Sequence, residues 1–140
     1  MSLPSSVLTM RTLLVSGTAA MALLAAMAAS AQEDGPAPTR LTVEYADAAL
    51  GIDEPAPRLA WHSPAKRQAA YQIRVTAAGK PVWDSGKVAS ADNAQIPYAG
   101  PALAARTRYS WQVRTWDAGG LESGWSRPGW WEMGLLAPAD

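Results

Sequence analysis

The segment TRYSWQVRTWD, residues 107–117, carries the strongest structural signal in this sequence. Large or β-branched residues alternate in it with polar ones: Tyr109, Trp111, Val113 and Thr115 on one side of a two-residue repeat, Ser110, Gln112 and Arg114 on the other. Successive side chains of a β-strand point to opposite faces, so this alternation predicts a strand with one buried face. Burying a large apolar side chain contributes about 1.5–3 kcal/mol, which makes this strand the expected centre of the domain.

Partners for this strand lie on both sides of it in the sequence. Alternating or β-branched runs occupy residues 41–45, 58–62, 71–77, 82–84, 94–97 and 130–133. Turn-forming Gly, Pro and Asp residues separate the runs, and 51–57 is expected to be a turn or an extended link. Seven short strands, with no helical pattern after residue 31, predict an all-β fold: a seven-stranded antiparallel β-sandwich.

Three local features are similar to fibronectin type III and immunoglobulin-like sandwiches. Tyr109 follows Leu103 by six residues across a loop, the spacing of a tyrosine corner, in which the phenol bonds back to the upstream backbone. Trp61 is placed to pack between the sheets, and Trp125 in the SGWS segment (123–126) is placed to close the sandwich. Trp111 shares the buried face of its strand with Tyr109. We therefore expect structural roles for these four aromatic residues.

Composition excludes several classes of function. The 140 residues carry 12 Lys and Arg against 12 Asp and Glu, so no excess of positive charge points to a nucleic-acid partner. The chain has no cysteine, which excludes disulfides, structural thiolate zinc sites and cysteine nucleophiles. We expect no cofactor and no metal.

The two ends of the sequence differ from its middle. Residues 1–31 combine Arg11, an apolar run and the small-x-small triplet Ala29-Ser30-Ala31, which predicts a signal peptide cleaved after Ala31. The expected product is secreted or periplasmic and has no membrane segment after cleavage. Residues 32–40 are expected to form a flexible linker, 41–136 the β-sandwich, and 137–140 the start of a further linker.

Six blocks of sequence, in order, carry a closer resemblance: GIDEPAPRLAW (51–61), QAAYQI (68–73), VWDSGKV (82–88), YAG (98–100), TRYSWQVRTWD (107–117) and EMGLL (132–136). They are similar to the N-terminal region of bacterial α-L-rhamnosidases of glycoside hydrolase family 78. The resemblance covers residues 41–136.

The resemblance implies a non-catalytic, fibronectin type III-like accessory module of a secreted α-L-rhamnosidase. In such an enzyme other domains remove terminal α-L-rhamnose from glycosides or polysaccharides, and an (α/α)₆ barrel carries the acidic catalytic residues. The implied partners are the downstream domains of the same polypeptide. A rhamnose-containing glycan is a further candidate partner, and a free-standing carbohydrate-binding or adhesion module is the alternative function.

No residue of this chain is expected to be catalytic, to bind a cofactor or to bind a metal. Inverting glycoside hydrolysis needs two carboxyl groups about 6.5–9.5 Å apart. The carboxylates fall mostly at strand ends and turns: Glu44, Asp47, Asp53, Glu54, Asp84, Asp92, Asp117, Glu122 and Glu132. His62 is the single histidine and is expected to face solvent, because it follows the inward Trp61.

The C-terminal tryptophans are the candidates for a binding surface. Trp130 and Trp131 are adjacent on a predicted strand, so one of them must face out. An exposed indole can serve as a docking surface for another domain or can stack on a sugar. The candidate docking or sugar-stacking residues are Trp116, Trp130, Trp131, Leu135 and Leu136.

Overall fold

The computed structural model describes residues 33–136. The predicted signal peptide, 1–31, and the predicted terminal linker, 137–140, lie outside this range. The described residues contain eight strands: β1 (Thr39–Val43), β2 (Ala48–Ile52), β3 (Arg58–His62), β4 (Gln68–Ala77), β5 (Lys80–Asp84), β6 (Ile96–Pro97), β7 (Arg108–Asp117) and β8 (Gly129–Met133). All of them belong to one compact unit that begins at Asp34.

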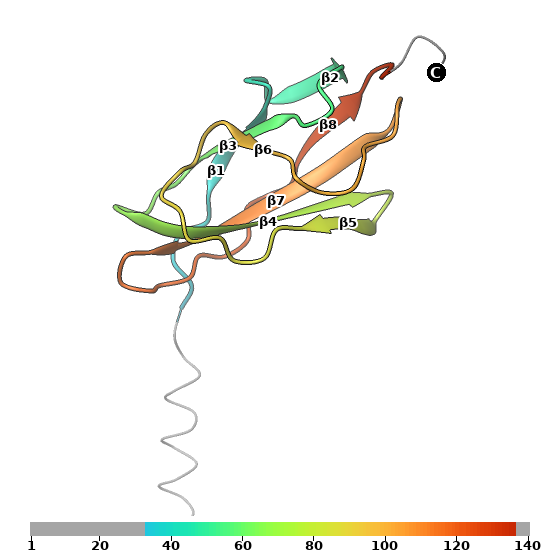
Figure 1. Ribbon diagram of the computed structural model, residues 1–140. Helices are drawn as coiled ribbons and strands as arrows, with labels where there is room; N and C mark the ends of the chain where they lie inside the picture. The colour runs from blue at the N-terminus through green and yellow to red at the C-terminus, as the bar shows by residue number, and fades with distance from the viewer. Residues whose placement is uncertain (1–32, 137–140) are drawn as a thin grey trace, which may run out of the picture. The chain divides into compact units, whose positions relative to one another are not determined.

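The strands form two facing sheets (Figure 1). One sheet has the order β1-β3-β6, and the other the order β2-β8-β7-β4-β5. The alternating segment forms β7, which lies at the centre of the larger sheet between β4 and β8. An immunoglobulin-like all-β sandwich, as predicted, is therefore confirmed. In residues 33–136 no helix is long and apolar enough to cross a membrane.

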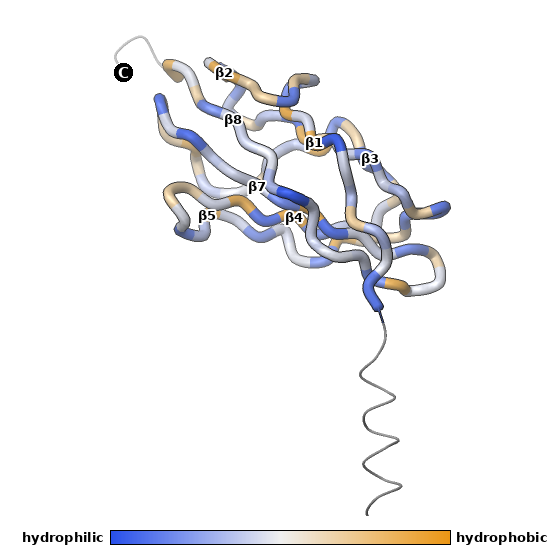
Figure 2. The backbone as a smooth tube through the Cα atoms, turned by 180° about the vertical axis from the view of Figure 1, so that it is seen from behind, coloured by the Kyte–Doolittle hydropathy of each residue, from blue (hydrophilic) through white to orange (hydrophobic). Residues whose placement is uncertain are grey.

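The core lies between the two sheets and follows the two-residue repeat. Short apolar and polar stretches follow one another along β4 and β5 in Figure 2. The inward positions are buried: Val43, Ala49, Leu59, Trp61, Tyr71, Ile73, Val75, Ile96, Tyr98, Leu103, Tyr109, Trp111, Val113, Trp131 and Met133. Because large aromatic side chains fill this space, a chain without phenylalanine still has a continuous core.

One strand was not expected from the sequence. The segment AALGI forms β2, although it lacks alternation and contains Gly51 with a φ of 67°. Strand β2 pairs in parallel with β8, through Ala48↔Trp130 and Ile52↔Met133. The described residues therefore hold eight strands rather than the seven expected, and the β2–β8 pairing is parallel, whereas the sequence predicted an antiparallel sandwich.

The expected flexible linker is partly ordered. The Gly35 N–H donates to the carbonyl of Glu122 at 2.7 Å, and the Gly124 N–H donates to the carbonyl of Gly35 at 3.2 Å. Pro38 is buried, and β1 already begins at Thr39. The linker prediction is therefore wrong from Gly35 onward. This segment is held by hydrogen bonds to a loop almost ninety residues later in the chain. A local sequence pattern could not predict its order, because the partners are so distant in sequence.

Candidate functional site

The carboxylates of the chain are mostly engaged in structural contacts. Glu44 pairs with Arg58 at 2.6 Å and also accepts the Arg58 backbone N–H at 2.7 Å. The hydrogen bond from the Arg58 guanidinium lowers the pKa of Glu44. Asp84 accepts hydrogen bonds from the Gln72 amide and from the Gly86 N–H, both at 2.8 Å, and the Gln72 bond lowers the pKa of Asp84. These groups are held in the ionised form that their partners need.

Two further acidic residues pair with arginines on the outer face of the larger sheet. Glu132 accepts from Arg108 at 3.2 Å, and Glu122 accepts from Arg114. His62 is exposed at the end of β3. Within residues 33–136 no group of three His, Asp or Glu side chains could hold a metal ion.

The tyrosine corner forms with the geometry that its spacing predicts. The Ala104 N–H donates to the Tyr109 hydroxyl at 2.8 Å, and Tyr109 is 4% exposed. The Tyr109 ring stacks on Trp131, with 5.3 Å between ring centroids and 23° between planes. Trp61 is also buried, packs edge-on against Tyr71 and donates its indole N–H to Gln68 at 3.1 Å.

The register of β7 and β8 decides which of the adjacent tryptophans faces out. Tyr109 pairs with Trp131, and Ser110 pairs with Trp130. Trp131 therefore shares the inner face with Tyr109 and is fully buried, which removes it from the candidate docking surface. Trp130 is outward and half-buried, and the Arg108 guanidinium lies 4.0 Å above its ring.

Of the two leucines that follow β8, one is also exposed and the other is not. Leu135 is 51% exposed. Leu136 was expected to extend an exposed patch, but it packs against the core instead. Leu50 on β2 is 66% exposed, although the sequence did not single it out. Both leucines belong to the β2–β8 region: Leu50 lies on β2, and Leu135 follows β8, the strand with which β2 pairs (Figure 1).

Neither Trp125 nor Trp116 fits its expected role. Trp125 does not close the sandwich but covers the outer face of the larger sheet, with the guanidinium groups of Arg74 and Arg114 at 4.0 and 4.7 Å from its ring. Trp116 is 8% exposed, because Lys87 and Arg114 lie 4.6 and 5.1 Å from its ring. It therefore offers no free face for docking or for a sugar.

Two serines of the SGWS segment explain the position of Trp125. The Ser126 hydroxyl accepts the Val113 N–H at 3.0 Å, and the Ser123 hydroxyl accepts the Thr115 N–H at 2.9 Å. These bonds attach residues 123–126 along β7 and so hold Trp125, which lies between the serines, over the outer face. Cation–π contacts with the arginines of that face then stabilise the indole.

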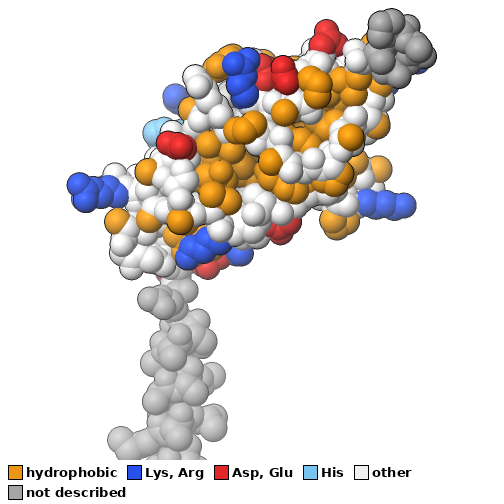
Figure 3. Space-filling view, viewed as in Figure 1, with side chains coloured by type: hydrophobic (Ala, Val, Ile, Leu, Met, Phe, Trp, Pro, Cys, Tyr) orange, Lys and Arg blue, Asp and Glu red, His pale blue; other side chains and the backbone are white. Residues whose placement is uncertain are grey.

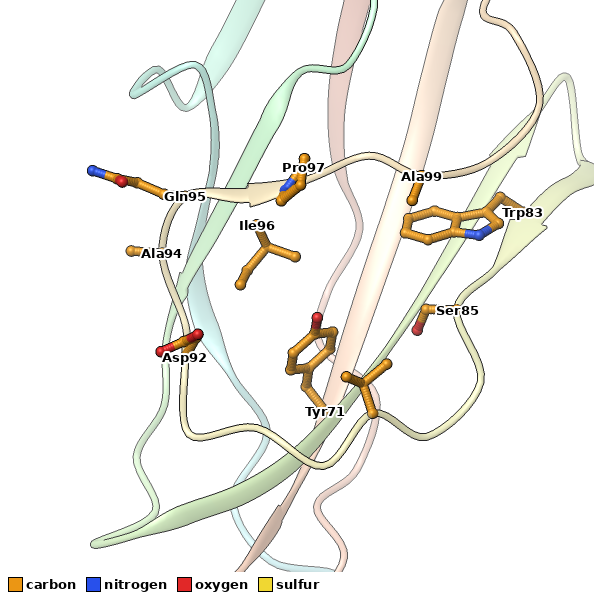
Figure 4. A pocket seen from close by; sticks show the side chains of 10 residues that line it. Tyr71, Trp83, Ser85, Asp92, Ala94, Gln95, Ile96, Pro97 and Ala99 are labelled. Atoms are coloured by element: carbon orange, nitrogen blue, oxygen red, sulfur yellow. The ribbon is translucent and has the colours of Figure 1, made fainter.

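One cavity involves residues to which the sequence analysis assigned no site. It measures about 710 Å³ and lies beside β5 and β6, the edge strands of the larger and the smaller sheet. Figure 4 shows the connection between β5 and β6 running around it, with Trp83 on one side, the Tyr71 hydroxyl directed into it and Asp92 at its rim. Apolar side chains gather over the middle of this face in Figure 3. The sequence held one signal for this cavity: Trp83 is a large aromatic residue in a predicted strand, residues 82–84, that is too short to bury it.

A second cavity, of about 440 Å³, lies beside Trp130 and Trp125. Arg40, Arg127 and Asp47 also line it. It brings the outward tryptophan of β8 next to the segment that was expected to be a linker.

Comparison with known proteins agrees with this architecture. A family model described as "Rha78A-like, N-terminal immunoglobulin domain" matches residues 38–137. An α-L-rhamnosidase of Streptomyces avermitilis is 53% identical over 107 residues, which are 70% of this chain and 10% of the relative. The crystal structure of a Streptomyces avermitilis α-L-rhamnosidase complexed with L-rhamnose superposes with a TM-score of 0.67 at 51% identity, covering 73% of this chain and 11% of that one.

A structure of α-L-rhamnosidase from Dictyoglumus thermophilum gives a TM-score of 0.71 at 31% identity, covering 77% of this chain and 13% of that chain. The chain spans about a tenth of the length of the curated relatives that it matches. On the match over residues 38–137, the chain belongs to the family of Rha78A-like N-terminal immunoglobulin domains found in α-L-rhamnosidases.

Proposed function

We propose that this chain is the non-catalytic N-terminal accessory module of a secreted α-L-rhamnosidase of glycoside hydrolase family 78. The observation that carries the proposal is the 53% identity to one tenth of an α-L-rhamnosidase. It is supported by the structural use of the carboxylates: Glu44, Glu122 and Glu132 pair with arginines, and Asp84 is held by amide donors. In this role the module supports the domains that hydrolyse terminal α-L-rhamnose.

The module contacts a neighbouring domain, in this proposal, through the exposed leucines of the β2–β8 region. Leu50 on β2 and Leu135 just after β8 both expose apolar area, and exposed apolar area can mark an interaction surface. Trp130 is less suited to this role than the sequence suggested, since Arg108 covers part of its ring. Export of the chain by its N-terminal segment is also part of the proposal.

A chimeric enzyme tests the supporting role. The matching segment of the Streptomyces avermitilis enzyme is deleted in one variant, and it is replaced by residues 33–136 of this chain in a second variant, the chimera. We expect deletion to lower the melting temperature of the enzyme and replacement to restore it. Leu50→Ser together with Leu135→Ser in the replaced module should abolish the restoration, whereas the exposed, uninvolved Leu121→Ser serves as the matched control.

A direct assay tests the absence of catalysis. The purified chain is incubated with nitrophenyl α-L-rhamnoside, and nitrophenol release is measured. No turnover is expected. Turnover that disappears when a carboxylate such as Asp92 is changed to Asn would overturn the accessory role, as would a deletion variant as stable as the intact enzyme.

A further inference from the structure

The cavity beside Trp83 has one aromatic wall that is fixed before any ligand binds. The Trp83 indole packs edge-on against Tyr98, with 5.0 Å between ring centroids. The indole also packs closely against Gly100, because a Cβ added to Gly100 would lie only 2.6 Å from Trp83 Cγ. The Tyr98 hydroxyl in turn donates to the carbonyl of Pro101 at 2.7 Å. The indole is half-buried and presents the rest of its surface to the cavity (Figure 4).

Two polar side chains at this cavity lack protein partners. Tyr71 is 9% exposed, yet its hydroxyl makes no hydrogen bond to any residue in the range 33–136, and Figure 4 shows it directed into the cavity. The Asp92 carboxylate also makes no hydrogen bond or ion pair within that range. Burial raises the pKa of Tyr71, and the negative charge of Asp92 raises it further, so the hydroxyl stays protonated and can donate. The hydroxyl is not among the fully buried, unbonded groups of the described residues, so water reaches it in the open cavity and a ligand hydroxyl can take the place of that water.

Most of the remaining lining is apolar and comes from Val88, Ile96, Pro97 and Ala99, and Gln95 also lines the cavity. The Ser85 hydroxyl is already used, because it accepts the Ile73 N–H and donates to the carbonyl of Gly86. An aromatic surface, a phenolic hydroxyl and a carboxylate match the apolar C–H face and the vicinal hydroxyls of a pyranose. The apolar remainder matches a methyl group in place of a hydroxymethyl group.

We propose that this cavity binds one 6-deoxyhexose unit of a glycan. The Trp83 indole contacts the ring, the Tyr71 hydroxyl and the Asp92 carboxylate bond its hydroxyls, and the 6-methyl group faces Val88 and Ile96. The inference rests on the proposed function and extends it: the accessory module holds a deoxyhexose-bearing chain near the domains that act on it.

Calorimetric titration of the purified chain with L-rhamnose tests the site, and L-mannose is the matched ligand because it differs by one hydroxyl on C6. We expect L-rhamnose to bind with a dissociation constant of about a millimolar, as suits one small sugar on an open site. L-Mannose should bind about tenfold more weakly, since its extra hydroxyl would be unpaired against apolar side chains. Absence of L-rhamnose binding up to about 50 mM, well above the expected constant, overturns the site. Equal affinity for both sugars overturns the deoxyhexose assignment.

Tyr71→Phe is the sharpest variant. The hydroxyl has no protein partner in the described range, so we expect the unfolding midpoint to stay unchanged while affinity for L-rhamnose falls roughly fivefold to tenfold, the loss of one hydrogen bond. Asp92→Asn should behave in the same way. Tyr109→Phe is the matched control: it removes a hydroxyl that bonds to the backbone, and it should lower stability and leave affinity unchanged. Unchanged affinity in Tyr71→Phe would overturn the assignment.

A neighbouring domain is the competing occupant, and the chimeric enzyme distinguishes it. If Trp83→Ser lowers the melting temperature of the chimera much more than that of the isolated chain, the cavity is covered by protein, and the sugar site is overturned. A module that stabilises the chimera but binds no L-rhamnose would retain the proposed function and refute this inference alone.

Discussion

The Tyr109→Phe substitution removes one oxygen atom from the tyrosine corner and leaves the packing of the ring intact. In the wild-type protein that oxygen accepts the Ala104 N–H at 2.8 Å. The phenylalanine ring can still stack on Trp131, whose centroid is 5.3 Å away, so no core volume is lost. The experiment therefore isolates a single hydrogen bond between β7 and the loop that precedes it.

The magnitude follows from the surroundings of the two partners. An unsatisfied buried group costs about 1–3 kcal/mol. Ala104 is exposed, so water can replace part of the lost bond at its N–H, whereas Tyr109 is 4% exposed. We therefore expect the free energy of unfolding to fall by about 1–2 kcal/mol. For a domain of this size each kcal/mol shifts the melting temperature by roughly 4–8 °C.

Urea unfolding followed by tryptophan fluorescence measures the effect, since a fall in the midpoint at a constant m-value reports a change in stability. Tyr71→Phe is the reference, because it removes a hydroxyl without a protein partner in the described range. A shift for Tyr109→Phe alone supports the reasoning. An unmoved midpoint, or equal shifts for the two variants, would show that the corner bond does not stabilise the fold.

Three further predictions concern the core, an ion pair and the N-terminus. Trp61→Ala should cost about 3–5 kcal/mol of unfolding free energy, since Trp61 is 4% exposed and its removal leaves a cavity; a smaller midpoint shift than for Tyr109→Phe would contradict this. Arg58 lowers the pKa of Glu44 from 4.5, so the ion pair stabilises the fold above about pH 4.5, and this contribution is lost as the pH falls through the lower folded-state pKa. Urea midpoints measured across this acidic range should therefore depend less on pH in Glu44→Gln than in the wild type. An unchanged pH dependence in the variant would be the contrary result. Mass spectrometry of exported material should find Gln32 as the first residue, and a retained 1–31 segment would refute the signal peptide.

Several features could be predicted from the residues alone, because they depend on the local chain. Alternation over residues 107–117 predicted β7 and its inner face, since side chains of a strand must point to alternate sides. The same rule required one of Trp130 and Trp131 to face out. The spacing of Leu103 and Tyr109 predicted the corner, since a short loop brings the hydroxyl to the backbone just upstream.

Which surfaces are free could be learned only from the folded chain, because the groups that cover them are distant in sequence. The pairing of Tyr109 with Trp131 buried the second tryptophan of β8 rather than the first. The serine hydrogen bonds to β7 hold Trp125 outside the core, where Arg74 on β4 contacts its ring, and Lys87 helps to cover Trp116. The cavity at Trp83 is lined by residues of β6, at the edge of the smaller sheet, and of β5, at the edge of the larger one, so two strands that do not pair with each other form it. A strand pattern gives the direction of each side chain, but exposure also depends on what the fold brings to that face.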